Sequence, residues 1–173
     1  MRSRIPGLGL TTDVIVGFPG ESDREFAESL DFVERTAFAR PHVFTFSPRA
    51  GTHAETLPDP VPHGVKKERT AAMRRVAKAS ERAFWRSCLG ETVAVVWEAG
   101  KDGRATGLSD NYIRVFCDLD GDLQGELGHC RLERLGPDGV EVRPILDPDP
   151  ELESPSGIRG AVGAGASALR ILS

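Results

Sequence analysis

TTDVIVGFPGES, residues 11–22, joins a strand-like run to a turn that glycine and proline specify tightly. The β-branched residues of the run predict a strand over residues 11–17. Asp13, Ile15 and Gly17 alternate along it, so we expect them to share one side of the sheet. An acidic side chain on that side is either paired or functional. Alone, the Gly17–Gly20 turn is best explained as a tight structural turn.

A second strand and loop change this interpretation. Ser22 and Glu25 have the spacing of a capping box, which predicts a helix that ends near Arg35. HVFTFS, residues 42–47, predicts a second strand, and a strand–helix–strand unit of this kind has parallel strands. FTFSPRAGT, residues 44–52, then ends in another glycine-containing loop. Two specialised loops therefore meet at the carboxyl edge of one sheet, where parallel α/β proteins bind ligands.

The rest of the chain contains two further types of sequence pattern. Residues 48–64 contain four prolines and predict an irregular crossing, and residues 65–86 predict a long basic helix. From residue 91 onward, short strand-like runs separated by Gly and Asp predict a small antiparallel barrel. The sequence thus predicts an α/β part over residues 1–86, an all-β part over 87–146, and a disordered tail over 147–173.

Charge is spread unevenly along the 173 residues. The chain carries a net charge of −4, yet residues 66–86 have eight basic and two acidic side chains, whereas residues 87–146 have six and eleven. One basic segment in an acidic chain indicates contact with a polyanion, although charge alone favours an ordinary solvated helix face. No run is long and apolar enough to span a bilayer, and the first residues do not resemble a signal peptide. We therefore expect a cytoplasmic protein without a membrane partner.

Three segments in order, TTDVIVGFPGES, HVFTFSPRAGT and LPDPVPHGVKKERTAAM, resemble the C-terminal half of the radical SAM methylthiotransferases. GLSDNYIRVF and GELGHCRLERL are similar to their C-terminal TRAM domain. Within this family the likeness is greatest to the enzymes that methylthiolate threonylcarbamoyladenosine in tRNA. The resemblance covers about residues 5–146. It implies a partial radical SAM (TIM-like) barrel with a parallel βαβ unit and a long helix, followed by a small antiparallel TRAM β-barrel.

The resemblance also implies where ligands bind. Ile15 and Gly17 would pack the adenine of S-adenosylmethionine, and Arg49 suits its carboxylate because guanidinium binds carboxylate bidentately. The residues implied for this cofactor are Asp13, Ile15, Gly17, Phe46 and Arg49. For tRNA, the TRAM-like part offers Asn111, Tyr112 and Arg114, and the basic helix offers Lys66, Lys67, Arg69, Arg74, Arg75 and Lys78. A strand position packed inside the barrel is an equally good explanation of Tyr112.

The chain also departs from the family pattern. The family holds a [4Fe-4S] cluster with a CxxxCxxC triad, but Cys88, Cys117 and Cys130 are scattered and are expected to be small buried side chains. We therefore assign no metal ligand and no catalytic residue, and we expect no activity from the chain alone. It is interpreted as a truncated or mis-started gene product, a split-gene half or a cut piece, with the missing N-terminal half as a partner in trans. A free-standing TRAM-type RNA-binding module and a non-functional remnant remain alternatives.

Overall fold

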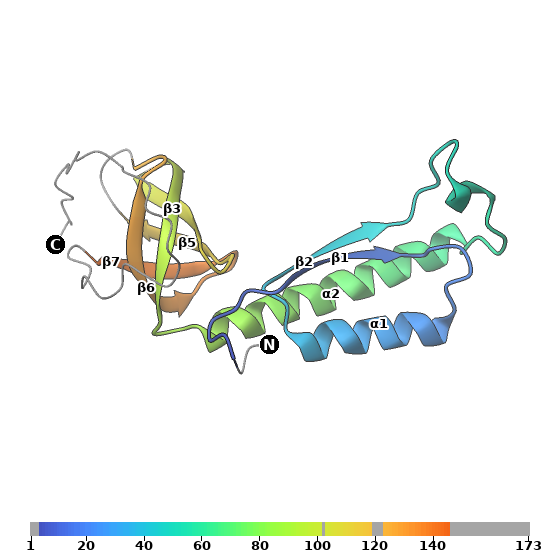
Figure 1. The fold of residues 1–173 in the computed structure, drawn as a ribbon, viewed down its shortest axis with the longest axis horizontal. Coiled ribbons are helices and arrows are strands. Elements are labelled where there is room, and N and C mark those ends of the chain that lie inside the picture. Colours follow the sequence, from blue (N-terminus) through green and yellow to red (C-terminus); the bar gives the residue numbers. More distant parts are fainter. Residues whose placement is uncertain (1–3, 102, 119–122, 146–173) are drawn as a thin grey trace. The chain divides into compact units, whose positions relative to one another are not determined.

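The computed structural model describes residues 4–101, 103–118 and 123–145. The chain divides after Ser87 into two units, Met1–Ser87 and Cys88–Ser173 (Figure 1). The tail predicted over residues 147–173 lies outside the described residues. Within the described part, no helix combines the length and the apolar character that crossing a membrane requires.

The first unit is built on two parallel strands with both long helices on one side (Figure 1). Its elements in order are β1 (Thr11–Val16), α1 (Asp23–Thr36), β2 (Arg40–Thr45), the 3-10 helix η1 (His53–Thr56) and α2 (His63–Ser87). The predicted parallel βαβ unit is confirmed. Some predicted bounds differ by up to two residues, because β2 was expected over residues 42–47 and α2 over residues 65–86. The short helix η1 in the crossing was not predicted.

Helix α1 forms where local chemistry favours it. The Ser22 side chain accepts a hydrogen bond from the Glu25 N–H, and the Glu25 carboxylate accepts one from the Ser22 N–H, so the predicted capping box is confirmed. The Ser22 hydroxyl also donates to Glu25 Oε2 (2.7 Å). This bond lowers the pKa of Glu25 most, and the bond from the Ser22 N–H adds to the effect. The helix ends where Ala37 adopts a left-handed conformation with φ of 49°.

The core of the first unit lies between the helices and the sheet. Val16, Val33, Phe38 and Met73 are its buried residues, and they come from β1, α1, the α1–β2 connection and α2 in turn. Residue 16 follows residues 12 and 14 on the helix-facing side of β1, while residues 11, 13 and 15 face away. The predicted alternation is therefore confirmed for Asp13 and Ile15, whereas Gly17 lies beyond the end of β1 and is buried.

The second unit is a small closed barrel. Its described strands are β3 (Thr92–Lys101), β4 (Arg104–Ser109), β5 (Arg114–Asp118), β6 (Leu127–Leu135) and β7 (Val140–Ile145), and they neighbour one another in the order β3-β4-β5-β7-β6 before closing on β3. The prediction of an antiparallel barrel is wrong for one pair, because β5 and β7 are parallel. A closed ring of five strands cannot alternate in direction at every step, so one parallel pair is unavoidable. ATGLSDNYIRVFCD, residues 105–118, is one of the strand-like runs of the sequence, but it contains most of β4, a turn, and β5.

Candidate functional site

The turn after β1 is held by its own backbone and by one carboxylate. Gly17 and Gly20 have φ of 77° and 81°, which glycine adopts without strain. The Gly17 N–H donates to Glu21 Oε2 (2.9 Å), and the Glu21 N–H donates to the Phe18 carbonyl (3.0 Å). The Gly20 N–H donates to the carbonyl of Asp59 in a distant loop (2.8 Å). These bonds are the reason that the turn is so tightly specified.

Arg69 fastens this turn to helix α2. Its side chain is buried, and Nη1 donates to both the carbonyl and the carboxylate of Glu21 (2.8 and 2.7 Å). Nη2 donates to Asp23 Oδ1 (2.6 Å). The hydrogen bond to Asp23 raises the pKa of Arg69, and Glu21 adds to the rise against the opposing effect of burial. The grouping of Arg69 with the basic residues that face RNA was therefore wrong, because its guanidinium is buried and forms ion pairs with Glu21 and Asp23.

The face of the sheet that points away from the helices is exposed and partly apolar. Ile15 and Phe44 are cross-strand partners and are 55% and 52% exposed. Asp13 is paired with His42 in the same register, and both are exposed. The structure therefore brings the predicted residues Asp13 and Ile15 onto one open face. It adds Phe44, which shares the alternation of HVFTFS and could have been found by aligning the two parallel strands.

Aromatic rings and one lysine gather at the carboxyl edge of this sheet. The rings of Phe18 and Phe46 lie edge to face with centroids 5.0 Å apart, and the Lys66 ammonium lies 5.9 Å from the Phe46 centroid. The Lys66 stem crosses Gly17 so closely that a Cβ there would lie 2.3 Å from Lys66 Cγ. Lys66 thus belongs to this edge more than to the outer face of α2. Arg49 is exposed, and its carbonyl accepts hydrogen bonds from Thr52.

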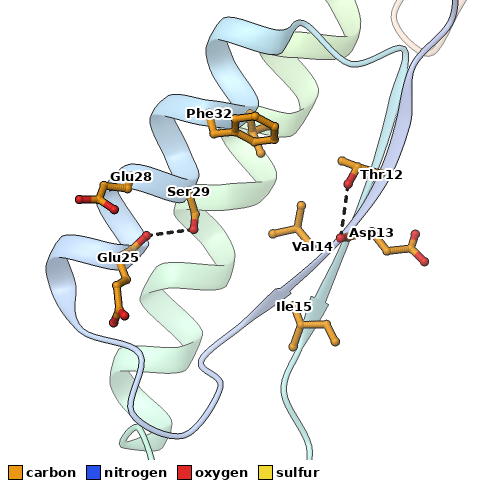
Figure 2. A pocket seen from close by; sticks show the side chains of 9 residues that line it. Thr12, Asp13, Val14, Ile15, Glu25, Glu28, Ser29 and Phe32 are labelled. Atoms are coloured by element: carbon orange, nitrogen blue, oxygen red, sulfur yellow. Dashed lines mark hydrogen bonds between the residues drawn. The ribbon is translucent and has the colours of Figure 1, made fainter.

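A shallow groove of about 540 Å³ runs between β1 and α1 (Figure 2). Sequence reasoning did not single it out. Figure 2 shows Val14 directed between the strand and the helix, with Phe32 above it on α1. Phe32 is 56% exposed, so one wall of the groove is apolar and open to solvent. Its lining residues are Thr12, Asp13, Val14, Ile15, Glu25, Glu28, Ser29, Phe32 and Val33.

Helix α2 presents basic side chains on its outer side. Lys67, Arg74 and Lys78 lie at i, i+7 and i+11, and they are exposed together with Arg75. The structure describes no ion pair for Lys67, Arg74 or Arg75. We call Lys67, Arg74, Arg75 and Lys78 the exposed basic face of α2. It keeps four of the six helix residues predicted for RNA contact, because Arg69 is buried and Lys66 is partly buried.

The turn between β4 and β5 contains two of the predicted RNA contacts. The Ser109 side chain donates to Asn111 Oδ1 (2.6 Å) and accepts from the Ile113 N–H (2.8 Å). Tyr112 is 47% exposed and has a φ of 67°, which is unusual for a bulky residue. The alternative that Tyr112 packs inside the barrel was therefore wrong, because it projects from a tight turn. Asn111 is occupied in holding that turn.

Arg114, the third predicted contact on the barrel, is partly neutralised. Its Nη1 donates to Glu98 Oε2 on the neighbouring face of the barrel (2.7 Å), and both side chains are about two-fifths exposed. An exposed ion pair of this kind contributes little to stability. Arg114 can exchange Glu98 for another anion, but it offers less free positive charge than its sequence position indicates.

The positive φ of Tyr112 leads to a first prediction. Tyr112→Gly should leave the barrel more stable than Tyr112→Ala by about 1 kcal/mol, because alanine retains the cost of the left-handed conformation and glycine does not. Urea unfolding of the two variants would measure the difference. Equal stability in the two variants would contradict this account of the turn.

The cysteines are small buried side chains, as predicted. Cys88, Cys117 and Cys130 are free and buried. Burial raises the pKa of Cys117 to about 11 and that of Cys130 to about 12. Iron–sulfur clusters are bound by thiolates, so these protonated thiols do not fit a [4Fe-4S] cluster. Among the described residues, no three His, Cys, Asp or Glu side chains gather as a metal ion requires.

The two raised thiol pKa values predict a loss of stability at alkaline pH. A cysteine thiol ordinarily has a pKa of 9.0, so above this pH the unfolded chain releases protons that the folded barrel retains. Stability should therefore fall between pH 9 and pH 11, by about 1.4 kcal/mol per pH unit for each thiol. Urea unfolding of the barrel across this range would measure the slope. A Cys117→Ala/Cys130→Ala variant should show a shallower slope, and an unchanged slope would contradict the prediction.

Comparison with known proteins finds relatives among the methylthiotransferases. No family model matches it. It is 36% identical over 142 residues to the threonylcarbamoyladenosine tRNA methylthiotransferase MtaB of Thermotoga maritima, which is 81% of this chain and 32% of that protein. It is 40% identical over 140 residues to the ribosomal protein uS12 methylthiotransferase RimO of Syntrophotalea carbinolica, 79% of this chain and 30% of that protein.

A third relative is the tRNA-2-methylthio-N(6)-dimethylallyladenosine synthase of Moorella thermoacetica, 37% identical over 138 residues, 78% of this chain and 31% of that protein. The chain is therefore homologous to the methylthiotransferases, so the resemblance to this family stated from the sequence is confirmed. It spans about a third of the length of the curated relatives it matches.

Proposed function

We propose that the chain is the C-terminal part of a radical SAM methylthiotransferase that modifies threonylcarbamoyladenosine in tRNA. The observation that carries this proposal is the 142-residue match to the relative named for that reaction. Neither unit of the chain is that long, so the match includes residues of both. A cytoplasmic location, where tRNA is used, belongs to the same proposal.

In this proposal, unit Met1–Ser87 is the end of a radical SAM barrel. S-adenosylmethionine, held at a reduced cluster, supplies the radical chemistry of such enzymes. The open sheet face suits the flat adenine, because Ile15 and Phe44 form an exposed apolar pair. Phe46 borders the same edge, and Arg49 is exposed beyond it, where its guanidinium could hold a carboxylate. Asp13 lies near Ile15 on the same face, and its carboxylate could accept a hydrogen bond from the cofactor.

The chain's own residues cannot supply the cluster. Its thiols are buried and protonated, and the residues predicted for the cofactor carry no soft metal ligand. The cluster would therefore have to come from a polypeptide segment outside these 173 residues. The part described here would bind and orient one side of the cofactor.

The barrel unit acts in this proposal as a TRAM-type domain that contacts tRNA. Tyr112 is exposed on a rigid turn, so its ring can stack on an unpaired base at little entropic cost. Asn111 positions that turn, and Arg114 can release Glu98 to meet a phosphate. The positive field comes chiefly from the exposed basic face of α2.

A second candidate function is recognition of a basic protein. Residues 87–146 carry eleven acidic and six basic side chains, and this negative balance opposes RNA binding. The relative from Syntrophotalea carbinolica is named for a ribosomal protein substrate, uS12. An acidic barrel would attract a basic protein more readily than a nucleic acid.

One binding experiment with the full chain separates the candidates. Fluorescence anisotropy would compare labelled tRNA bearing threonylcarbamoyladenosine with labelled uS12 protein at several salt concentrations. Tighter binding of the tRNA supports the proposed function, and tighter binding of uS12 supports the second candidate. Binding of tRNA without any interaction with S-adenosylmethionine would favour a free-standing RNA-binding module. Binding of neither macromolecule would favour a non-functional remnant.

A further inference from the structure

The buried ion pair between α2 and the turn after β1 is not among the residues proposed to touch the cofactor. Arg69 is 7% exposed, and the side chain of its partner Glu21 is 13% exposed. Burying both charges is expensive, and such pairs are retained only with good geometry and further hydrogen bonds. Here both conditions are met, since Arg69 also bonds the Glu21 carbonyl and Asp23.

The same carboxylate connects Arg69 to the backbone that ends β1. Glu21 Oε2 accepts from the Gly17 N–H (2.9 Å) and from Arg69 Nη1 (2.7 Å). One oxygen therefore joins helix α2 to the first residue of the turn. The Arg69 guanidinium also lies over the Phe26 ring, 5.3 Å from its centroid, while its Nε has no acceptor in the described structure. All three side-chain hydrogen bonds of Arg69 in the described structure therefore go to Glu21 and Asp23.

We propose that Arg69 is a positioning residue, which acts through Glu21 to hold the Gly17–Glu21 turn in the shape that S-adenosylmethionine requires. This rests on the proposed cofactor site. Gly17 and Phe46, joined at the edge by the Lys66 stem, would shift if the turn relaxed. A preorganised turn spares the ligand the entropic cost of ordering it. Arg69 itself need not touch the cofactor.

The first measurement tests the positioning without any ligand. Amide hydrogen exchange, followed by NMR on the full chain, would compare Gly17 with Ala39, whose N–H donates to the Leu10 carbonyl at the opposite end of the sheet (2.7 Å). In Arg69→Met, Gly17 exchange should accelerate at least about tenfold while Ala39 changes far less. Arg69→Lys keeps the charge but cannot contact Glu21 and Asp23 with two separate nitrogens. Its Gly17 exchange rate should therefore lie between those of the parent chain and Arg69→Met.

The matched control is Arg24→Met. Arg24 also forms an ion pair with a glutamate, Glu28, but both side chains are exposed on α1. This variant removes an arginine–glutamate pair from the same unit without touching the turn, so neither amide should change. If Arg69→Met accelerates Gly17 and Ala39 equally, Arg69 is a general stabiliser of the unit and the proposal is overturned.

The second measurement is titration of the same proteins with S-adenosylmethionine, followed by chemical-shift changes. Affinity should fall by about tenfold in Arg69→Met, recover in part in Arg69→Lys, and stay unchanged in Arg24→Met. A loosened turn with unchanged affinity would overturn the positioning role and leave the cofactor site standing. A parent chain that does not bind S-adenosylmethionine would overturn the cofactor site and, with it, the role proposed for Arg69.

Discussion

Gly17→Ala is expected to lower the free energy of unfolding of unit Met1–Ser87 by about 2–3 kcal/mol. Two costs combine at this position. The φ of 77° is unfavourable for any residue with a Cβ, and the added Cβ would lie 2.3 Å from Lys66 Cγ and 2.7 Å from Lys66 Cδ. The Lys66 side chain would have to move away from the position in which its ammonium lies 5.9 Å from the Phe46 ring centroid. Urea unfolding monitored by a probe in the first unit would measure the loss.

Two further variants separate these costs. Gly20 has a φ of 81°, but no atom lies within 4 Å of the place that an added Cβ would occupy, so Gly20→Ala should cost only the conformational share, about 1 kcal/mol. Lys66→Ala removes the crowding atoms, and Gly17→Ala should then cost about as much as Gly20→Ala. If Gly17→Ala is equally costly with and without Lys66, the close approach of the lysine stem is not the cause.

Replacing Lys67, Arg74 and Arg75 by glutamine should weaken tRNA binding by about a hundredfold at about 0.1 M salt. These three exposed cations have no ion pair in the described structure, so they are free to displace counterions from phosphates. The slope of log K against log salt should fall by about 2–3, because each phosphate that is no longer neutralised removes about 0.7–0.9 from it. Fluorescence anisotropy with labelled tRNA across a salt series would measure both quantities.

The neighbouring lysine provides the matched control. Lys66→Gln makes the same chemical change one residue away, but Lys66 lies across Gly17 and over the Phe46 ring. It should therefore change the salt slope much less than Lys67→Gln. A triple variant that binds tRNA with the parent's slope would show that the exposed basic face of α2 is an ordinary solvated surface. Tyr112→Ala should instead cost roughly 1–3 kcal/mol of binding with little change in slope.

Features that depend on a few consecutive residues could be predicted from the sequence. The capping box of Ser22 and Glu25 and the alternation of β1 arise from bonds and side-chain directions within one segment. The parallel pairing of β1 and β2 followed from the helix between them. The meeting of two loops at one sheet edge followed from that pairing, so the general place of the candidate site could also be predicted.

The barrel shows where such reasoning is insufficient. Residues 105–118 read as one strand-like run, but they contain a turn at Tyr112 that no glycine marks. The Ser109 side chain holds this turn with two hydrogen bonds. The parallel pairing of β5 with β7 is a property of ring closure. Neither feature is visible in a local pattern of apolar and polar residues.

The sequence by itself determined β1, α1, β2 and α2, their order, and the number of charges on each. Tertiary structure alone decided which charges remain free. Arg69 looked like its neighbours on a basic helix, yet it is buried against Glu21, 48 residues away. Thr70 and Ser80 also fill the buried side of α2, bonding to Thr45 and to the Val33 carbonyl, which is why the apolar pattern of that helix is loose. A buried charge or hydroxyl needs a hydrogen-bonding partner that is also removed from water. In this protein, long-range packing brings that partner into contact.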